Sequence, residues 1–288
     1  MFKGSFVAII TPFKDGKIDV ETYSKLIDFQ IKNGTSGIIP CGTTGESATL
    51  SFAEHKELVK LTVQIVNKKV PVIAGTGSNS TAEAIELTKS AKDDGVDAAL
   101  VLTPYYNKPT QEGLYQHYKA IAENVNIPIV IYNVPGRTAV SINPETIARL
   151  CEFKNIVALK DATGNLDYTS KVLDLCDICL LSGDDSLTLP MMSLGAKGVI
   201  SVVANIMPKE TAELVSSFMQ GDLNRSRELH FKLFNLIKTL FIETNPIPIK
   251  AAAEMMGLVG KEIRLPLVPM SDKNRELLKE EMKKLALL

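Results

Sequence analysis

Eight short apolar segments recur along the chain, and each is followed by a longer stretch with the apolar spacing of a helix. The segments are rich in Val, Ile and Leu and show no clear alternation of apolar and polar residues, which is typical of parallel strands buried on both faces. They cover residues 6–10, 37–40, 70–74, 98–102, 128–133, 156–160, 178–183 and 198–202. Eight successive strand–helix units predict an α/β protein, a (β/α)8 barrel, because right-handed crossovers leave few other arrangements.

The eight units predict a barrel over residues 1–220 and leave residues 221–288 as a C-terminal extension packed against it. Three helical patterns follow in the extension, at 222–241, from Asn245 to Gly257 and after Ser271. A doubly wound parallel sheet is the structural alternative. It is less favoured because eight near-equal units show no point at which the strand order would reverse.

Two of the predicted helices begin with a recognisable signal. Ser51 with Glu54, and Ser80 with Glu83, have the spacing of a capping box, in which each side chain binds a free backbone N–H at the helix start. We therefore expect helices to begin just after Ser51 and Ser80, with both glutamates turned back toward the serine.

The charge balance and the hydropathy pattern exclude several functional classes. The 288 residues carry 32 basic and 33 acidic side chains, so the chain offers no basic surface for nucleic acid or anionic lipid. No apolar run approaches the ~20 residues of a membrane-spanning helix. The first residues do not resemble a signal peptide, and there are four cysteines, so we expect a reduced, cytoplasmic protein. No metal-binding motif is present in the sequence, and we expect no metal.

Polar residues follow several of the predicted strands, at the end where barrels carry their active sites. They are the segment Gly42–Glu46 (GTTGE), Tyr105 and Tyr106, the segment Tyr132–Arg137 (YNVPGR), Lys160 with Asp161, and Gly183 with two aspartates after it. If the barrel prediction is right, these groups meet at one mouth.

Lys160 carries the most information of this set. It ends an apolar strand, so its stem passes along the barrel interior and its amine faces the rim. Exclusion of water there favours the neutral amine, which is the form that attacks a carbonyl to give a Schiff base. The alternative is a lysine that extends to the surface and pairs with Asp161 or another carboxylate.

Three other features admit both a functional and a structural interpretation. The segment Gly42–Glu46 offers backbone N–H groups and the hydroxyls of Thr43 and Thr44 to a carboxylate or phosphate, or it is a plain glycine turn. Tyr132 can transfer a proton, or it is a buried tyrosine with a satisfied hydroxyl. Arg137 can bind a substrate carboxylate with two hydrogen bonds, or it forms a surface ion pair.

Taken together, the segments Gly42–Glu46, Tyr132–Arg137 and Lys160–Gly164 (KDATG) resemble the dihydrodipicolinate synthase family. This family belongs, with N-acetylneuraminate lyase, to the class I pyruvate aldolases, and the resemblance runs from about residue 4 to the end. It implies a homotetramer, a dimer of dimers, that condenses pyruvate with aspartate semialdehyde in lysine biosynthesis without a cofactor. Arg137 and the pair Thr43-Thr44 favour the synthase over the lyase.

The resemblance also implies a role for each site residue. Lys160 forms the imine with pyruvate, and Thr44 holds the pyruvate carboxylate, with the Ile200 backbone and Gly183 beside the substrate. Because the imine converts pyruvate into an enamine nucleophile, no metal or organic cofactor is required.

Proton transfer is assigned by the same resemblance to a relay of hydroxyl groups. Tyr132 acts as the acid and base in imine formation and cyclisation, together with Thr43 and Tyr106. Tyr106 enters from the neighbouring subunit. Arg137 binds the carboxylate of the second substrate.

Lysine inhibits some members of this family from a site at the subunit interface behind the tyrosine relay. The positions that match this site offer a carboxylate, an amide and a phenol, which suit an amino acid. They are Ser47, Ala48, His55, Asn79, Glu83 and Tyr105. Phe52 departs from the sensitive pattern, which often has a histidine there, so we expect weakened and partial inhibition by lysine.

Two further functions are less favoured. Gly75-Thr-Gly77 follows a strand as in a dinucleotide-binding enzyme, but the third glycine of that motif is missing. A barrel that senses a keto acid without turnover would be expected to lose the lysine or the tyrosine relay, and this chain keeps both.

Overall fold

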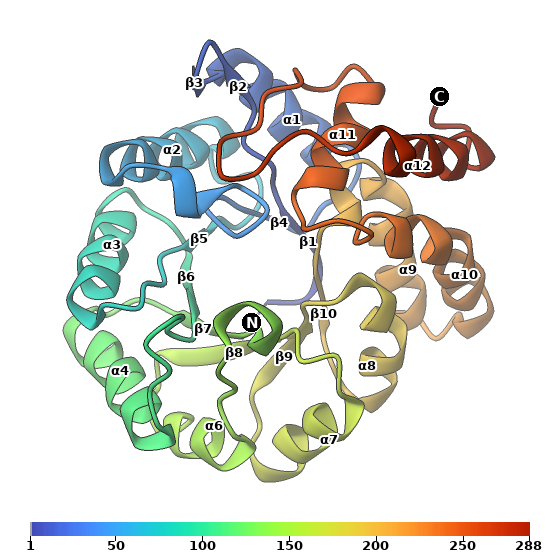
Figure 1. Cartoon of the computed structure of the whole chain (residues 1–288). Coiled ribbons are helices and arrows are strands. Elements are labelled where there is room, and N and C mark those ends of the chain that lie inside the picture. Colours follow the sequence, from blue (N-terminus) through green and yellow to red (C-terminus); the bar gives the residue numbers. More distant parts are fainter. Residues whose placement is uncertain (1) are drawn as a thin grey trace.

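The computed structural model describes residues 2–288, and within them eight parallel strands form the inner ring of a barrel (Figure 1). The strand order is β4-β1-β10-β9-β8-β7-β6-β5, and a bridge from Ile38 to Val72 joins the two ends of this order. The strands are β1 Gly4–Ala8, β4 Gly37–Ile39, β5 Ile73–Gly75, β6 Ala98–Leu102, β7 Ile129–Asn133, β8 Ile156–Asp161, β9 Cys179–Ser182 and β10 Gly198–Ser201. The predicted (β/α)8 fold is confirmed.

Helices cover the outside of the ring and follow the strands in turn (Figure 1). They are α1 Val20–Lys32, α2 Phe52–Val66, α3 Thr81–Asp93, α4 Gln111–Asn124, α6 Pro144–Leu150, α7 Leu166–Leu175, α8 Thr188–Leu194 and α9 Pro208–Met219. Short helical turns lie in the loops at α5 Pro135–Thr138, η1 Ser47–Thr49, η2 Asp185–Leu187 and η3 Val203–Asn205. Among residues 2–288, no helix is long and apolar enough to span a membrane.

Three helices follow the barrel, as predicted for the C-terminal extension. They are α10 Leu223–Thr239, α11 Ile247–Met255 and α12 Asp272–Lys284. α10 packs against α9 and α12, and α11 packs against α12. The expected division at residue 220 falls in the turn between α9 and α10.

Two strands, β1 and β5, differ by more than one residue from the bounds expected from the sequence. β1 ends at Ala8 because the Ile10 N–H donates to Asn205 Oδ1 (3.0 Å) rather than to a neighbouring strand. β5 begins at Ile73 rather than at residue 70, since Pro71 has no N–H to contribute to a sheet. A short hairpin of β2 (Phe13–Lys14) and β3 (Lys17–Ile18) was not predicted.

The two expected capping boxes turn out differently. Ser51 and Glu54 form a complete box at the start of α2. Ser80 accepts from the Glu83 N–H, but the Glu83 carboxylate accepts a hydrogen bond from Ser78 Oγ at 2.8 Å instead of turning back to Ser80. The second box was therefore only half right, because Ser78 competes for the carboxylate.

Alternate residues of the strands point into the barrel and form an inner apolar cluster. Its members include Phe6, Ile39, Ile73, Leu100, Val130, Ala158, Leu181 and Ile200. Tyr132 and Lys160 occupy the last inward positions of β7 and β8, so they stand on top of this packed layer. The floor of the candidate site is thus the apolar core itself.

Candidate active site

A cavity of ≈ 460 Å³ opens among the C-terminal ends of the barrel strands. Its wall contains six residues to which the sequence analysis assigned a catalytic or substrate-binding role, which are Thr43, Thr44, Tyr132, Arg137, Lys160 and Gly183. They come from four different strand–loop junctions. The barrel therefore brings together groups that are far apart in the sequence, as its topology requires.

Lys160 and Tyr132 are neighbours across β8 and β7 and share a register position. Both side chains are buried, and Lys160 Nζ lies 4.1 Å from the centre of the Tyr132 ring. The Lys160 amine therefore lies over the electron-rich face of the phenol ring. A side chain at Gly183 would meet Lys160 Cε at 3.0 Å, so this glycine leaves room for the lysine stem.

Asp161 faces away from Lys160, because successive residues of a strand point to opposite faces. Its carboxylate accepts hydrogen bonds from Thr163 Oγ1 and Thr169 Oγ1, each at 2.7 Å. The alternative interpretation, in which Lys160 pairs with Asp161, was therefore wrong. The amine is left facing the cavity.

The segment Gly42–Glu46 folds into a tight turn at the cavity wall. Gly45 N donates to Gly42 O at 3.0 Å, and Thr11 Oγ1 donates to Gly45 O at 2.7 Å. Among residues 2–288, the backbone N–H groups of Thr43 and Thr44 find no protein acceptor. The turn therefore presents free donors next to the Thr44 hydroxyl, an arrangement that suits an anionic oxygen.

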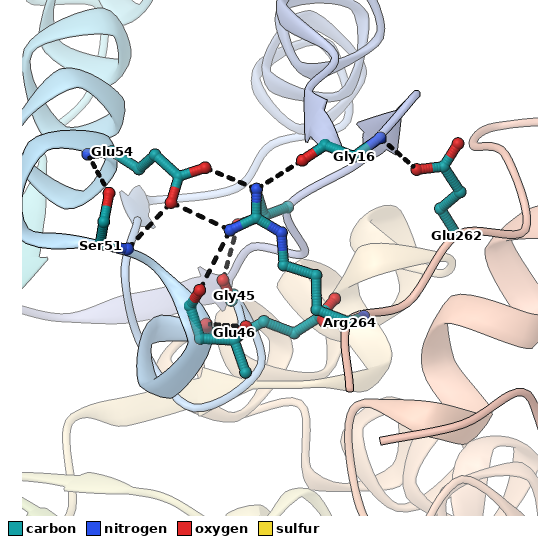
Figure 2. A network of polar contacts seen from close by, with 9 residues as sticks. Gly16, Gly45, Glu46, Ser51, Glu54, Glu262 and Arg264 are labelled. Carbon is teal, nitrogen blue, oxygen red and sulfur yellow. Dashed lines mark hydrogen bonds and ion pairs between the residues drawn. The ribbon is translucent and has the colours of Figure 1, made fainter. Parts of the chain in front are cut away.

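Residues of the C-terminal extension bind the Gly42–Glu46 turn through the Glu46 carboxylate. Glu46 has a left-handed backbone (φ 57°), and its buried carboxylate accepts from Lys250 Nζ (2.5 Å) and from the Arg264 N–H (3.0 Å). Figure 2 shows the Arg264 guanidinium reaching the Glu54 carboxylate on one side and the Gly16 carbonyl on the other. These contacts anchor the turn to α2 and to the β2–β3 hairpin.

Asn245 supplies the other contact from the extension to the site. Its Nδ2 donates to Thr44 Oγ1 at 3.0 Å, and its backbone carbonyl accepts from Arg137 Nη2, also at 3.0 Å. Sequence reasoning used Asn245, Lys250 and Arg264 at most as helix markers. Nothing local in the sequence indicates contacts that join positions about 200 residues apart.

Two of the predicted catalytic and substrate-binding residues lie outside the cavity wall. Ile200 is buried in the inner apolar cluster, beneath the cavity. Tyr106 is 90% exposed, with a left-handed backbone (φ 73°), on the loop between β6 and α4. In a single chain, the phenol of Tyr106 is therefore not part of the site.

The predicted lysine-site residues lie on η1, α2, α3 and the loops that precede α3 and α4. His55 is buried, with Nε2 2.7 Å from the Gly75 carbonyl, and burial lowers the pKa of this imidazole. Asn107 Nδ2 donates to the Asn79 carbonyl at 2.9 Å, which ties the two loops together. Tyr105 and Phe52 are both exposed.

Comparisons of the chain with a family model, with related sequences and with solved structures all point to one family. The model of the dihydrodipicolinate synthetase family matches residues 1–285. The 4-hydroxy-tetrahydrodipicolinate synthase of Geotalea daltonii is 58% identical over the full length of both chains. A crystal structure of dihydrodipicolinate synthase from Aquifex aeolicus is 53% identical over 99% of both chains, with a TM-score of 0.98. The chloride-inhibited enzyme from Acinetobacter baumannii, complexed with pyruvate, is 49% identical over 100% of both chains, with a TM-score of 0.98. The chain therefore belongs to the dihydrodipicolinate synthetase family.

Proposed function

We propose that this protein is a lyase that condenses pyruvate with L-aspartate 4-semialdehyde to give 4-hydroxy-tetrahydrodipicolinate. The observation that carries the proposal is the buried amine of Lys160, which faces the cavity 4.1 Å from the Tyr132 ring centre. Relatives at 56–58% identity bear the name of this synthase, which supports the choice of substrates. The product serves the synthesis of diaminopimelate and lysine.

The chemistry begins with attack of Lys160 Nζ on the keto carbon of pyruvate. Loss of water gives an imine, and loss of a proton from the pyruvate methyl group gives an enamine. The enamine carbon then attacks the aldehyde carbon of the second substrate. The amino group of that substrate finally closes the ring by displacing the lysine amine, which restores the enzyme.

Each step moves a proton, and Tyr132 is the side chain beside the amine that can donate and accept one. Thr44 and the free N–H groups of its turn bind the pyruvate carboxylate. Arg137 lies elsewhere on the cavity wall and binds the carboxylate of the semialdehyde. Thr43 and a neighbouring subunit's copy of Tyr106 extend the proton relay. Because Tyr106 reaches a site only through a second subunit, we further infer an oligomer. The resemblance to the family supports a cytoplasmic homotetramer.

Reductive trapping tests this function directly. Sodium borohydride with pyruvate should fix a covalent adduct on Lys160, identified by peptide mapping, because hydride reduces the imine. Lys160→Arg should form no adduct and lose most activity, since a guanidinium stays protonated and is no nucleophile. Lys238→Arg is the matched control, because Lys238 also lines the cavity. This variant should keep the adduct on Lys160 and the activity of the parent.

Two outcomes would contradict the proposal. A chain that forms no adduct under these conditions does not use Schiff-base chemistry. Rapid release of pyruvate from N-acetylneuraminate, with little condensation of the semialdehyde, would identify the lyase branch instead. The place of Arg137 in the cavity wall favours a small acidic aldehyde over a sugar acid.

A further inference from the structure

Asn245 contacts both residues to which the proposed function assigns a substrate carboxylate. It lies in the segment between α10 and α11, is 4% exposed and lines the cavity. Its side-chain amide donates to Thr44 Oγ1, and its backbone carbonyl accepts from Arg137 Nη2. The two contacts use different parts of the residue, so a side-chain substitution removes the first and leaves the second.

The contact with Thr44 determines where that hydroxyl can donate. A threonine hydroxyl has one hydrogen and two lone pairs, and the Asn245 amide occupies one lone pair. Within the described residues this is the hydrogen bond that Thr44 Oγ1 makes, so its own hydrogen is free for an acceptor in the cavity. A carboxylate is an acceptor that strengthens such a bond through its charge.

The carbonyl oxygen of the Asn245 amide contributes nothing to the stability of the fold. Oδ1 is buried and has no hydrogen-bond partner among residues 2–288. Buried polar atoms in folded proteins nearly always find a partner, because an unpaired one destabilises the fold. An apolar residue of similar size would avoid this penalty, which indicates that the amide is present for the site.

We infer that Asn245 is a positioning residue that holds the Thr44 hydroxyl as a hydrogen-bond donor toward the pyruvate carboxylate. The inference rests on the proposed function, and it adds a group that acts through Thr44 and does not react itself. Through its backbone, the same residue also sets the place of Arg137. A single residue of the C-terminal extension thus fixes the spacing between the two proposed carboxylate anchors.

Two substitutions separate this role from a structural one. Asn245→Leu removes the donor and keeps the branching and the number of heavy atoms of the side chain. Asn245→Asp keeps the shape but can only accept, so the Thr44 hydroxyl turns away from the cavity to donate to Asp. The readout is the pyruvate concentration that half-saturates borohydride trapping, which needs no second substrate. We expect an increase of about 10- to 100-fold for both variants, as for a lost hydrogen bond to a charged group, and a larger one for Asp.

Two further measurements distinguish a positioning role from a structural one. They are the melting temperature and the KM for the semialdehyde. The melting temperature of Asn245→Leu should be unchanged or higher, because the unpaired Oδ1 is gone. The KM for the semialdehyde should change far less than that for pyruvate, since the backbone contact with Arg137 is kept. Asn235→Leu, on the exposed face of α10, is the matched control and should behave as the parent.

A double-mutant cycle with Thr44→Val shows whether Asn245 acts through that hydroxyl. In the Thr44→Val background, Asn245→Leu should have no further effect on pyruvate saturation. Equal effects in both backgrounds, or unchanged saturation in the single variants, would overturn the inference while the parent still forms its adduct. If the parent forms no adduct, the proposed function itself fails. If the leucine variant does not fold, pyruvate saturation of the isosteric aspartate variant tests the inference instead.

Discussion

Lys250 Nζ lies 2.5 Å from Glu46 Oε1, and both side chains are at most 5% exposed. Lys250 also donates to the Thr11 carbonyl at 3.1 Å and stands 4.6 Å from the centre of the Phe13 ring. Burial lowers the pKa of Lys250, and the charge of Glu46 opposes this shift. The pair therefore depends on both partners, and it holds the backbone two residues after Thr44.

Removal of one partner of this pair should destabilise the protein strongly. Lys250→Met leaves the Glu46 carboxylate buried without its counter-charge, so the free energy of unfolding should fall by about 3–5 kcal/mol. Denaturant titration measures the change. Lys56→Met, which breaks the exposed pair of Lys56 with Glu86, is the control and should lose at most about 1 kcal/mol. An equally small loss for Lys250→Met would show that the pair is not needed for the fold.

Arg137→Ala should separate the two substrates. Since the guanidinium is proposed to bind the semialdehyde carboxylate, the KM for that substrate should rise by roughly 10- to 100-fold. Borohydride trapping of pyruvate on Lys160 should remain close to that of the parent, because Thr44 is the proposed anchor there. A similar loss for both substrates would assign Arg137 a structural role through its bond to the Asn245 carbonyl.

Tyr106 should serve the site of a neighbouring subunit, because its side chain is 90% exposed and lies outside the cavity of its own chain. Tyr106→Phe and Lys160→Arg should each be nearly inactive alone. When the two variants are mixed and reassembled, one site of each mixed pair joins an intact Lys160 to an intact Tyr106. Such mixing should restore about a quarter of the parent activity at random association. No recovery would show that Tyr106 acts within its own chain or not at all.

His117 should make the stability depend on pH in mildly acidic solution. Burial lowers the pKa of His117 to about 4, against roughly 6.5 in an unfolded chain. Between these values the unfolded state binds the proton more readily, so stability is full above pH ~6.5 and is lost as the pH falls toward ~4. The loss is on the order of 3 kcal/mol.

The test compares the parent with His117→Gln by denaturant titration at several pH values. The buried His55 and the partly buried His230 act in the same direction, and both remain in the variant. The variant should therefore show a shallower decline of stability with falling pH. Parallel curves for the two proteins would contradict the assignment of the effect to His117.

The strands were predictable because buried parallel strands leave continuous apolar segments of four to six residues, and helices with clear start signals separate them. The hairpin of Phe13–Ile18 was missed because strands of two residues are too short to show a period. Its turn residues Asp15 and Gly16 both have positive φ, as expected for a two-residue hairpin turn. The Asp-Gly pair was the available signal.

The site was predictable to the extent that residues at strand ends form it. Lys160 and Tyr132 could be placed at one mouth from the barrel topology alone. Asn245 could not, because it meets Thr44 across 201 positions and no periodicity relates the two segments. The Glu83 carboxylate was assigned to the Ser80 N–H by spacing, whereas in the fold it accepts from the Ser78 hydroxyl and the Ser80 N–H donates to Ser78 Oγ.

Lysine should inhibit the enzyme partially and weakly. At the predicted site the Glu83 carboxylate already accepts a hydrogen bond from Ser78, and the exposed Phe52 ring offers no hydrogen bond where a histidine would. One missing neutral hydrogen bond weakens binding by about 0.5–1.5 kcal/mol, which is several-fold and not a complete loss.

Titration of activity with lysine at fixed substrate concentrations should therefore reach a plateau above zero. Phe52→His should shift the curve to lower lysine concentrations by roughly 2- to 10-fold, since it restores a polar partner. Phe52→Leu, which changes the ring without adding a polar group, is the control and should leave the curve in place. Glu83→Gln should weaken inhibition, because the carboxylate is the group expected to bind the lysine ammonium. A flat response of the parent and of Phe52→His to millimolar lysine would show that these positions form no lysine site.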